Sequence, residues 1–323
     1  MTLHISEADV RAVFTMPMAI DAVEEVSRKQ AAGDVVVHPR KRFEFPGGRF
    51  FHHMAAADYS ANRVATKQYT YVNGRLTFVV SLYSMETGEL LALMEGDFLG
   101  QKRTGAASGV ATKYLARANA KTAAIIGTGG QARTQLEAIA AVRKLESVAV
   151  YGRDAARREE FAREMFEKLG IPVRAAASPA EAVRDVGIVC TATTSGQPVL
   201  FGADLTAGVH VNAIGANHIR KRELDDAAVL KADLVAVDSI EQSRQEAGDL
   251  VLGFASDSAR WGQVIELSQI VAGKATGRKS DSQITLFKSN GIAAWDLAAA
   301  IRVYTEVTKR KIGRPLLLWQ PAS

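Results

Sequence analysis

Hydrophobic positions in the first part of the chain change from helical to alternating spacing. The segment Ser6-Glu7-Ala8-Asp9 is typical of a capped helix start, and residues 18–32 carry apolar side chains at helical spacing up to Gly33. After Pro39 the pattern predicts short strands at 49–57, 63–72, 78–83 and 90–94, the last two joined by a hairpin turn at 85–89. Residues 104–115 are small and apolar, which favours a helix packed closely on another layer. We expect a mixed α+β unit over residues 1–118.

From residue 119 onward, short apolar runs alternate with helical patterns. The runs are 123–126, 148–151, 173–175, 188–192, 209–214 and 234–238. Such alternation favours a mostly parallel, doubly wound α/β sheet. One intervening helix begins at Ser178-Pro179-Ala180-Glu181, a capping box with proline at N1.

A long amphipathic pattern at 293–309 predicts a final helix that returns to the first domain. The predicted architecture is therefore a Rossmann-type domain at 119–292. A second, discontinuous α+β domain is expected at 1–118 and 293–323.

A glycine cluster follows the first of these apolar runs. Residues 123–126 lead into Gly127-Thr128-Gly129-Gly130, and a helix is expected from Gln131 to Val142. This strand–turn–helix is typical of a dinucleotide-binding βαβ unit, in which the helix N-terminus offers free N–H groups to phosphates. Gly127 suits the tight turn, Gly129 lets the backbone approach a pyrophosphate, and Ala132 lets the helix pack on its strand. We expect cofactor contacts at Gly127, Gly129, Gly130, Gln131 and Ala132.

The end of the second strand carries information on the cofactor. In NAD-binding folds an acidic residue about 20 positions beyond the glycines takes the ribose hydroxyls. Here the strand runs into Gly152-Arg153-Asp154, where Arg153 can meet a 2′-phosphate and Asp154 can cap the next helix. We therefore favour NADP(H), with NAD(H) possible. Thr193 and Thr194 follow the run 188–192 and lie at the strand end where such sheets bind ligands.

Composition narrows the class of protein. The 323 residues are 47% hydrophobic and 23% charged, with a net charge of +5. The only compact basic cluster, Pro39 to Arg42, has no interleaved aromatic residues, which argues against nucleic-acid binding. Cys190 is the single cysteine and lies in an apolar run, so we expect a buried thiol and no disulfide. Neither a signal peptide nor a membrane-spanning run is recognisable, and we expect a cytoplasmic protein.

Histidine spacing gives no metal site. His52 and His53 are adjacent on a predicted strand and point to opposite faces, so at most one of them faces a pocket. The remaining histidines lack ligand spacing, and we expect no bound metal.

Several segments together resemble the ornithine cyclodeaminase/μ-crystallin family. They cover nearly the whole chain in the family's order, and the Lys-Arg-Thr-x-Ala-x-Ser and Gly-x-Gly-x-Gln-Ala pieces are fairly specific. The segments are 65–67, 101–108, 127–132, 212–217, 222–225, 237–239, 246–249 and 287–291. The resemblance implies a homodimer whose subunits have one NAD(P)-binding domain and one domain for substrate binding and dimerisation. It also implies chemistry at an amine or imine carbon next to a carboxylate.

The resemblance assigns substrate-binding roles to basic residues. Arg103 and Lys67 align with positions that bind the substrate carboxylate, for which Arg103 offers a two-pronged fork and Lys67 a point charge. Lys67 is also a candidate proton donor, because burial beside Arg103 would lower its pKa. Purely electrostatic anchoring is an equal alternative. Lys41 falls where the family keeps a third basic contact, with a register uncertain by one residue because Arg40 and Arg42 flank it.

One position departs from the family pattern. Cyclodeaminases carry an aspartate where this chain has Asn217, and asparagine cannot take a proton. A cyclodeaminase is therefore disfavoured, although Asn217 can still hydrogen-bond a substrate. Glu266 matches loosely a family glutamate at the substrate pocket. Gly291 is a further substrate-side position, and Ile214, Gly215 and Ser289 are expected to contact the cofactor.

Together these features predict an NAD(P)H-dependent imine reductase or the reverse amino-acid dehydrogenase. Catalysis would rest on Lys67, Arg103 and Asn217. The partner is a small 2-imino or 2-amino acid with a carboxylate; the cations Lys41, Arg42, Lys67 and Arg103 suggest an acidic one such as iminosuccinate. The alternatives are an ornithine-cyclodeaminase-like ammonia lyase, and a non-catalytic NADP(H)-dependent ligand-binding protein of μ-crystallin type.

Overall fold

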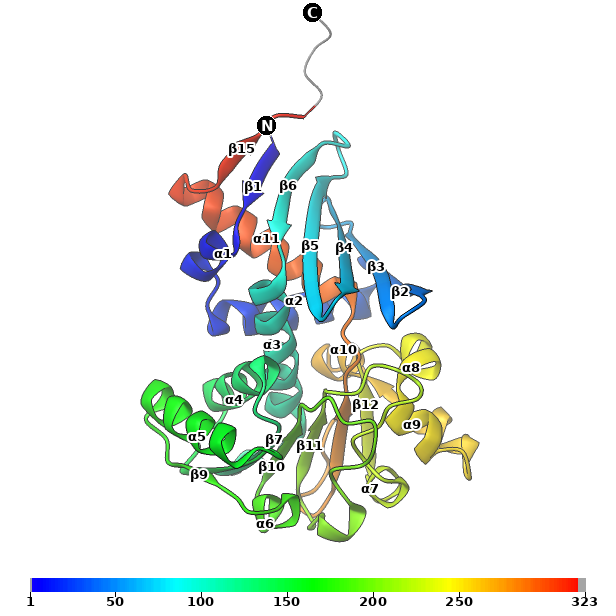
Figure 1. The fold of residues 1–323 in the computed structure, drawn as a ribbon. Helices are drawn as coiled ribbons and strands as arrows, with labels where there is room; N and C mark the ends of the chain where they lie inside the picture. The colour runs from blue at the N-terminus through cyan, green and yellow to red at the C-terminus, as the bar shows by residue number, and fades with distance from the viewer. Residues whose placement is uncertain (1, 319–323) are drawn as a thin grey trace, which may run out of the picture. The chain divides into compact units, whose positions relative to one another are not determined.

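The computed structural model describes residues 2–318, and the chain separates into two compact units (Figure 1). The first unit comprises residues 1–103 and 292–323, and the second comprises Thr104–Gly291. The first division falls inside helix α3 (Asp97–Leu115), whereas the sequence pattern placed a boundary at residue 118. The segment 104–115, assigned above to the first domain, thus lies in the second unit. The chain returns to the first unit at Ile292, directly before its last helix.

The first unit is built on a seven-stranded sheet with the order β15-β1-β6-β5-β4-β3-β2. Neighbouring strands from β6 to β2 are antiparallel, while β1 runs parallel to β6. The strands are β1 (Thr2–Ile5), β2 (Val35–Phe45), β3 (Arg49–Asp58), β4 (Arg63–Val72), β5 (Arg75–Ser84), β6 (Leu90–Glu95) and β15 (Arg314–Leu316). The alternating segments therefore form the predicted strands, and β1, β2 and β15 are additional.

Three helices complete the first unit: α1 (Glu7–Val13), α2 (Met16–Ala32) and α11 (Ala293–Arg310). Ser6 caps α1 in the predicted capping box with Asp9, and Gly33 ends α2 in the left-handed conformation with φ 89°. Helix α11 packs on α2 and on strands β2 to β5. Its first half is rich in buried alanines, which allow a close approach to the sheet.

A β-bulge in β2 explains why this strand escaped prediction. His38 lies opposite Ala55 and Lys41 lies opposite His53, so Pro39 and Arg40 together face Met54. Proline and the charged run that follows it interrupt the alternating pattern on which strand prediction depends. The bulge also decides which basic side chains share a face of the sheet.

The second unit contains an eight-stranded sheet with the order β13-β12-β14-β11-β10-β7-β8-β9, in which every neighbouring pair is parallel. The strands are β7 (Thr122–Ile126), β8 (Ser147–Tyr151), β9 (Val173–Ala175), β10 (Ile188–Thr191), β11 (His210–Ala213), β12 (Leu234–Val237), β13 (Ile265–Glu266) and β14 (Thr285–Lys288). All six predicted strands are present, and β13 and β14 are additional. The α/β fold class is therefore confirmed.

Helices lie between these strands along the chain (Figure 1). They are α4 (Gly130–Val142), α5 (Ala155–Leu169), α6 (Pro179–Val183), α7 (Asp226–Leu230), α8 (Ile240–Glu246), α9 (Gly248–Gly253) and α10 (Leu267–Val271), with the 3₁₀ turns Gly202–Asp204 and Ser258–Gln263. Asp154 caps α5, as expected. Ser178 caps α6, but the Glu181 carboxylate accepts from the Ala177 N–H instead of closing the predicted box with Ser178.

Buried aliphatic residues form the core of the second unit. Ala124, Val189, Val211, Val235 and Leu286 come from five adjacent strands and are each at most 6% exposed. Cys190 is fully buried on β10, as predicted for its thiol from the apolar run that contains it. Burial and the nearby Glu223 hold the pKa of this thiol well above its usual range.

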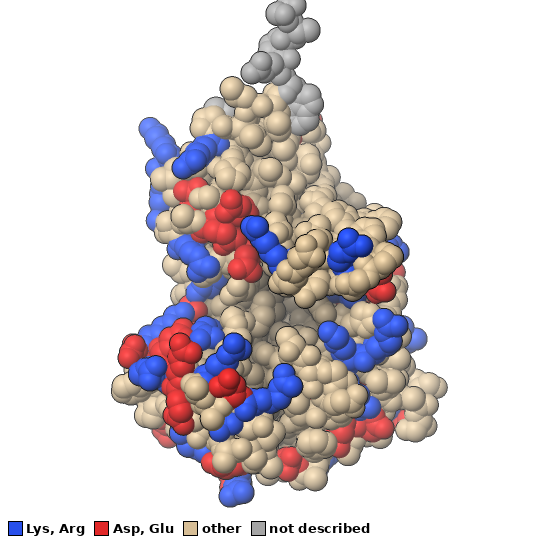
Figure 2. All heavy atoms as spheres, in the orientation of Figure 1, with Lys and Arg blue, Asp and Glu red and all other residues tan. Residues whose placement is uncertain are grey.

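Surface charge is mixed on the face drawn in Figure 2, where Lys and Arg side chains are interspersed with Asp and Glu. No described helix combines the length and apolar character that crossing a membrane requires.

Candidate functional site

Two predicted substrate residues of the first unit meet at one buried carboxylate. Lys67 on β4 and Arg103 on α3 both contact Oδ1 of Asp296, on the first turn of α11, with the Lys67 Nζ and the Arg103 Nε each 2.9 Å away. The three side chains are 4%, 7% and 2% exposed, respectively. Sequence elements that are far apart in the chain thus assemble the predicted pair, and Asp296 is the member that sequence reasoning missed.

The charges of this cluster perturb one another. The pKa of Lys67 is lowered to about 8, first by burial and then by the positive charge of Arg103, while Asp296 opposes the shift. Burial alone would raise the pKa of Asp296, but Arg103 and Lys67 outweigh it and the pKa lies below its usual value. An ammonium group that titrates near neutral pH is suited to proton transfer.

The β2 bulge presents Arg40 to this cluster. Arg40 is 7% exposed and its charge also lowers the pKa of Lys67, whereas Lys41 is exposed and lies opposite His53. Met54, which faces Pro39 and Arg40, pairs across the sheet with Lys67. The structure therefore brings Arg40, one residue from the predicted Lys41, to the face that carries Lys67.

Aromatic rings extend the same face beyond Lys67. Its Nζ lies 5.4 Å from the centre of the Phe78 ring, and Phe78 stacks on Tyr69 with centroids 5.3 Å apart. His52 packs against Tyr69 and stacks on Phe50, with centroids 4.8 Å and 4.2 Å away. His52 is thus the histidine on the Lys67 face, while His53 belongs to the other face.

In the second unit, the glycine loop has the expected form. Gly127 has φ +128°, and a Cβ there would lie 2.4 Å from the Ala192 carbonyl oxygen. A Cβ at Gly129 would meet nothing within 4 Å, and no described side chain caps the helix that Gly129 opens. Ala132 is fully buried against the sheet, whereas Gly130 and Gln131 open α4. Space above Gly129 and uncapped N–H groups of α4 fit a bound pyrophosphate.

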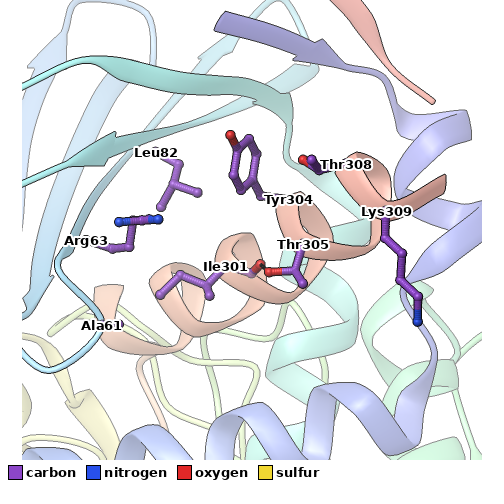
Figure 3. Close-up of a pocket in the computed structure, with 8 residues that line it drawn as sticks. All are labelled: Ala61, Arg63, Leu82, Ile301, Tyr304, Thr305, Thr308 and Lys309. Atoms are coloured by element: carbon purple, nitrogen blue, oxygen red, sulfur yellow. Dashed lines mark hydrogen bonds between the residues drawn. The ribbon is translucent and has the colours of Figure 1, made fainter. Parts of the chain in front are cut away.

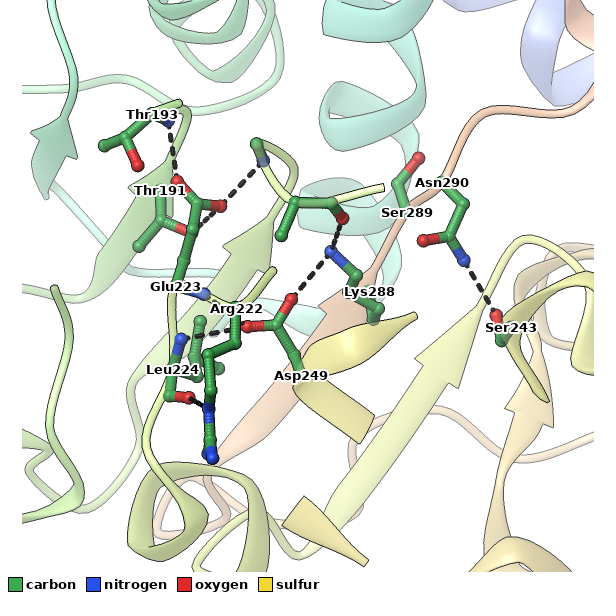
Figure 4. Close-up of polar contacts among 12 residues, drawn as sticks. Thr191, Thr193, Arg222, Glu223, Leu224, Ser243, Asp249, Lys288, Ser289 and Asn290 are labelled. Atoms are coloured by element: carbon green, nitrogen blue, oxygen red, sulfur yellow. Dashed lines mark hydrogen bonds and ion pairs between the residues drawn. The ribbon is translucent and has the colours of Figure 1, made fainter. Parts of the chain in front are cut away.

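A buried glutamate ties the loops after two neighbouring strands (Figure 4). The Glu223 carboxylate accepts hydrogen bonds from the Thr193 N–H at 2.6 Å, the Gly215 N–H at 2.7 Å and the Thr191 hydroxyl at 2.9 Å. A Cβ at Gly215 would lie 2.2 Å from the Thr193 carbonyl oxygen, so the predicted Thr193 and Gly215 loops are in direct contact. Burial raises the pKa of Glu223. Glu223 lies in the segment 222–225 that resembles the family, but the sequence assigned it no role.

The buried ion pair of Asp249 and Lys288 holds the Glu223 backbone in place. Asp249 accepts from the N–H groups of Glu223 and Leu224 at 2.6 Å and 2.9 Å, and its other oxygen pairs with the Lys288 ammonium at 2.9 Å. Lys288 ends β14 and also donates to the Ala216 carbonyl. The network therefore joins the carboxyl ends of β10, β11 and β14 (Figure 4).

Asp238 organises another pair of predicted positions. Its Oδ2 accepts from the Ser289 hydroxyl at 3.2 Å and from the N–H groups of Asn290 and Gly291, both at 2.6 Å. Glu266 accepts from the Ile240 N–H at 3.0 Å at the start of α8. These contacts account structurally for Gly291, Ser289 and Glu266, and their expected ligand contacts stay predictions.

The other predicted positions of the second unit differ in exposure. Arg153, Thr194 and Asn217 are exposed, whereas Ile214 is 8% exposed and donates its N–H to the Thr191 carbonyl. Exposure leaves Arg153 free to meet a ligand phosphate from the end of β8. Among the described residues, no cluster of three metal-ligating side chains is present.

A pocket of about 410 Å³ lies in the first unit against the second half of α11 (Figure 3). Its lining is mixed, with two cations, three hydroxyls and aliphatic side chains, and it contains none of the predicted site residues. The lining residues are Ala61, Arg63, Leu82, Ile301, Tyr304, Thr305, Thr308 and Lys309.

Comparison with known proteins gives a consistent result. The model of the ornithine cyclodeaminase/mu-crystallin family matches residues 2–311. A Delta(1)-pyrroline-2-carboxylate reductase of Bacillus cereus is 43% identical over 239 residues, covering 74% of this chain and 73% of the relative.

Two solved structures are similar along almost their full length. The Thermococcus litoralis Delta(1)-pyrroline-2-carboxylate reductase, in complex with NADH and L-proline, has a TM-score of 0.94 and 36% identity, covering 97% of this chain and 100% of its own. An archaeal alanine dehydrogenase dimer with bound NAD has a TM-score of 0.92 and 30% identity, covering 98% and 99%.

Replacing Glu223 by glutamine tests the buried network. The two backbone N–H donors address different carboxylate oxygens, so either orientation of an amide leaves one of them without an acceptor. We expect Glu223→Gln to lower the free energy of unfolding by about 1–3 kcal/mol in urea denaturation followed by circular dichroism. The exposed Glu160→Gln on α5 serves as the control and should unfold like the wild type. Equal stability of both variants would contradict the role given to Glu223.

Proposed function

Because this chain belongs to the ornithine cyclodeaminase/mu-crystallin family, we propose that it reduces the C=N bond of a small 2-imino acid with NAD(P)H. The chain is an NAD(P)-dependent oxidoreductase of carbon–nitrogen bonds, and the reverse reaction oxidises the corresponding amino acid. The observation that carries the proposal is the buried cluster in which Asp296 pairs with both Lys67 and Arg103. Together with Arg40, this cluster keeps an excess of positive charge where a substrate carboxylate can bind.

The second unit would bind the dinucleotide. Its pyrophosphate would lie over Gly129 at the N-terminus of α4, and the loops carrying Thr193 and Gly215 would line the site at the neighbouring strand ends. When bound, the nicotinamide supplies the hydride for reduction or takes it up in oxidation. We favour NADP(H), because exposed Arg153 stands where NAD-binding folds place a carboxylate.

The first unit would bind the substrate carboxylate. Arg103 contacts Asp296 through Nε, which leaves its two terminal nitrogens available for a bidentate pair. We assign the third basic contact to Arg40 in place of Lys41, since Arg40 is buried on the Lys67 face and Lys41 is exposed. Fixed cations orient the imine and stabilise charge without reorganisation during the reaction.

Lys67 would supply the proton. As hydride adds to the imine carbon, the π electrons of the C=N bond move to nitrogen, and nitrogen takes a proton from the Lys67 ammonium. The products would be the amino acid, the oxidised nicotinamide and a neutral lysine that regains its proton from solvent. A pKa of about 8 lets Lys67 act as the acid in reduction and as the base in oxidation.

The aromatic side of the face favours a cyclic imine. Tyr69 and Phe78 border Lys67, and such rings pack against apolar methylene groups better than against a second carboxylate. Lys41 is directed away from this face. Arg42, however, lies opposite His52 on the Lys67 face, so an acidic imine such as iminosuccinate is the second candidate. We therefore put pyrroline-2-carboxylate first among the substrates to be tried. A cyclodeaminase reaction stays disfavoured, because Asn217 has no acidic proton to exchange.

An activity screen tests the reaction. We expect oxidation of NADPH or NADH, followed by loss of reduced nicotinamide absorbance, with pyrroline-2-carboxylate and with its six-membered homologue. Pyruvate, oxaloacetate and glyoxylate with ammonia or methylamine complete the panel. Lys67→Met should reduce kcat about 100-fold, because it removes the acid and one cation.

Two results would contradict the proposal. Release of ammonia from ornithine without net cofactor turnover would indicate a cyclodeaminase. No cofactor oxidation with any substrate of the panel, with NADPH and a small acid still binding, would indicate a ligand-binding protein.

Replacing Arg153 tests the cofactor preference. Arg153→Ser removes the cation expected to meet the 2′-phosphate, so KM for NADPH should rise roughly tenfold while KM for NADH stays unchanged. Arg157→Ser, which removes an exposed arginine from the first turns of α5, is the matched control. A parallel change for both cofactors, or none, would refute the assignment of Arg153.

A further inference from the structure

We propose that Asp296 is the positioning residue of the substrate site. Through one shared oxygen it fixes Lys67 and Arg103, and it keeps Lys67 protonated in the pH range in which the enzyme reduces its substrate. The inference rests on the proposed function and extends it to a residue that the sequence did not identify.

Geometry is the first ground. The Lys67 Nζ and the Arg103 Nε reach the same Oδ1 atom at equal distances of 2.9 Å, although they come from a strand and from a different helix. Oδ2 of Asp296 is buried and accepts no hydrogen bond from the described residues. Within the described residues, the Asp296 carboxylate therefore accepts side-chain hydrogen bonds from the two cations that would bind the substrate.

Burial is the second ground. The neighbours of Asp296 in sequence, Trp295 and Leu297, are 1% and 0% exposed, so an anion here lies in an apolar stretch of α11. A buried ion pair is on average no more stabilising than well-packed apolar residues of similar volume. Stability alone therefore gives no reason for an aspartate at this position, whereas the need to hold two cations does.

Electrostatics is the third ground. Three charged groups act on Lys67: Arg103 on α3, Arg40 on β2 and Asp296 on α11. Both arginines disfavour the ammonium form, and Asp296 is the single group of the three that favours it. Asp296 stays ionised because Arg103 and Lys67 lower its pKa and because it occupies the first turn of α11, where the helix dipole favours an anion.

Loss of the Asp296 charge would make Lys67 lose its proton more readily. Removing the negative charge of Asp296 leaves Lys67 with burial and two like charges, so its pKa falls below the present value of about 8. Reduction needs the ammonium form of Lys67. As the pH is raised, the variant would therefore lose reductase activity at a lower pH than the wild type. Oxidation needs the neutral amine and would begin at a lower pH.

The test uses Asp296→Asn, which preserves shape and removes charge. We expect the alkaline limb of kcat/KM for imine reduction and the acidic limb for amino-acid oxidation both to move down by about one pH unit or more. A merely structural role would lower both rates at every pH and leave the limbs in place, which would overturn the proposal.

The control is Asp58→Asn. Asp58 is 2% exposed and pairs at 2.9 Å with Lys29, whose side chain is 25% exposed, so this variant also removes a buried carboxylate from a lysine–aspartate pair of the same unit. It should lose stability and keep both pH limbs. If Asp296→Asn fails to fold, Asp296→Ser, which is uncharged and leaves room for a water molecule, should give a smaller shift in the same direction.

A binding measurement separates this proposal from the proposed reaction. Pyrrole-2-carboxylate, a planar analogue that cannot be reduced, should bind the wild type with an affinity that falls as pH rises through about 8. In Asp296→Asn the fall should come about one unit earlier, as measured by calorimetry. This readout needs no turnover, so an inactive wild type would refute the reaction alone. Identical pH dependence in both proteins, or no binding to the wild type, would refute the role of Asp296.

Discussion

The proposed substrate site depends on one buried carboxylate that compensates two buried cations. Removing Lys67 and Arg103 from water is costly, and they also repel each other; Asp296 offsets both effects because it contacts each of them at 2.9 Å. The compensation is partial, since Arg40 adds a third positive charge to the same face. In the proposed site this excess positive charge would attract an anionic substrate, and the low polarity around it would strengthen that attraction.

In the second unit, buried carboxylates likewise compensate polar groups that are removed from water, here backbone N–H groups. Glu223 accepts from the backbone after β10 and β11, and Asp238 accepts from the backbone after β12 and β14. Each takes the place of water for N–H groups at the carboxyl ends of parallel strands, where a doubly wound sheet binds its ligand. Burial raises the pKa of both acids, and the backbone donors counteract this effect. The loops expected to line the cofactor site are thereby held in place before a ligand arrives.

Much of this arrangement could be predicted from the sequence. Apolar runs between helices are typical of a parallel sheet, and they located β7 to β12. The glycine loop, Lys67 and Arg103 followed from local motifs and from the family resemblance. Asp296 could not be found in this way, because it lies 229 residues from Lys67 in the chain and its helix has an ordinary amphipathic pattern. The bulge in β2 was not predicted either; it places Arg40 on the Lys67 face, whereas the sequence indicated Lys41 as the basic contact, with a register uncertain by one residue. Glu223, Asp249 and Asp238 bind backbone groups of distant loops, and hydrophobic periodicity carries no information on such partners.

The most direct test of the account compares one carboxylate with its neutral isostere. Pyrrole-2-carboxylate and pyrrole-2-carboxamide have nearly the same shape, and calorimetry on the wild-type protein at neutral pH measures how much of the affinity is due to charge. If the cluster of Lys67, Arg103 and Arg40 binds the substrate carboxylate, the amide should bind roughly 100-fold more weakly, a difference of about 2.7 kcal/mol. Equal affinities would show that the buried cations do not recognise a carboxylate and would contradict the account.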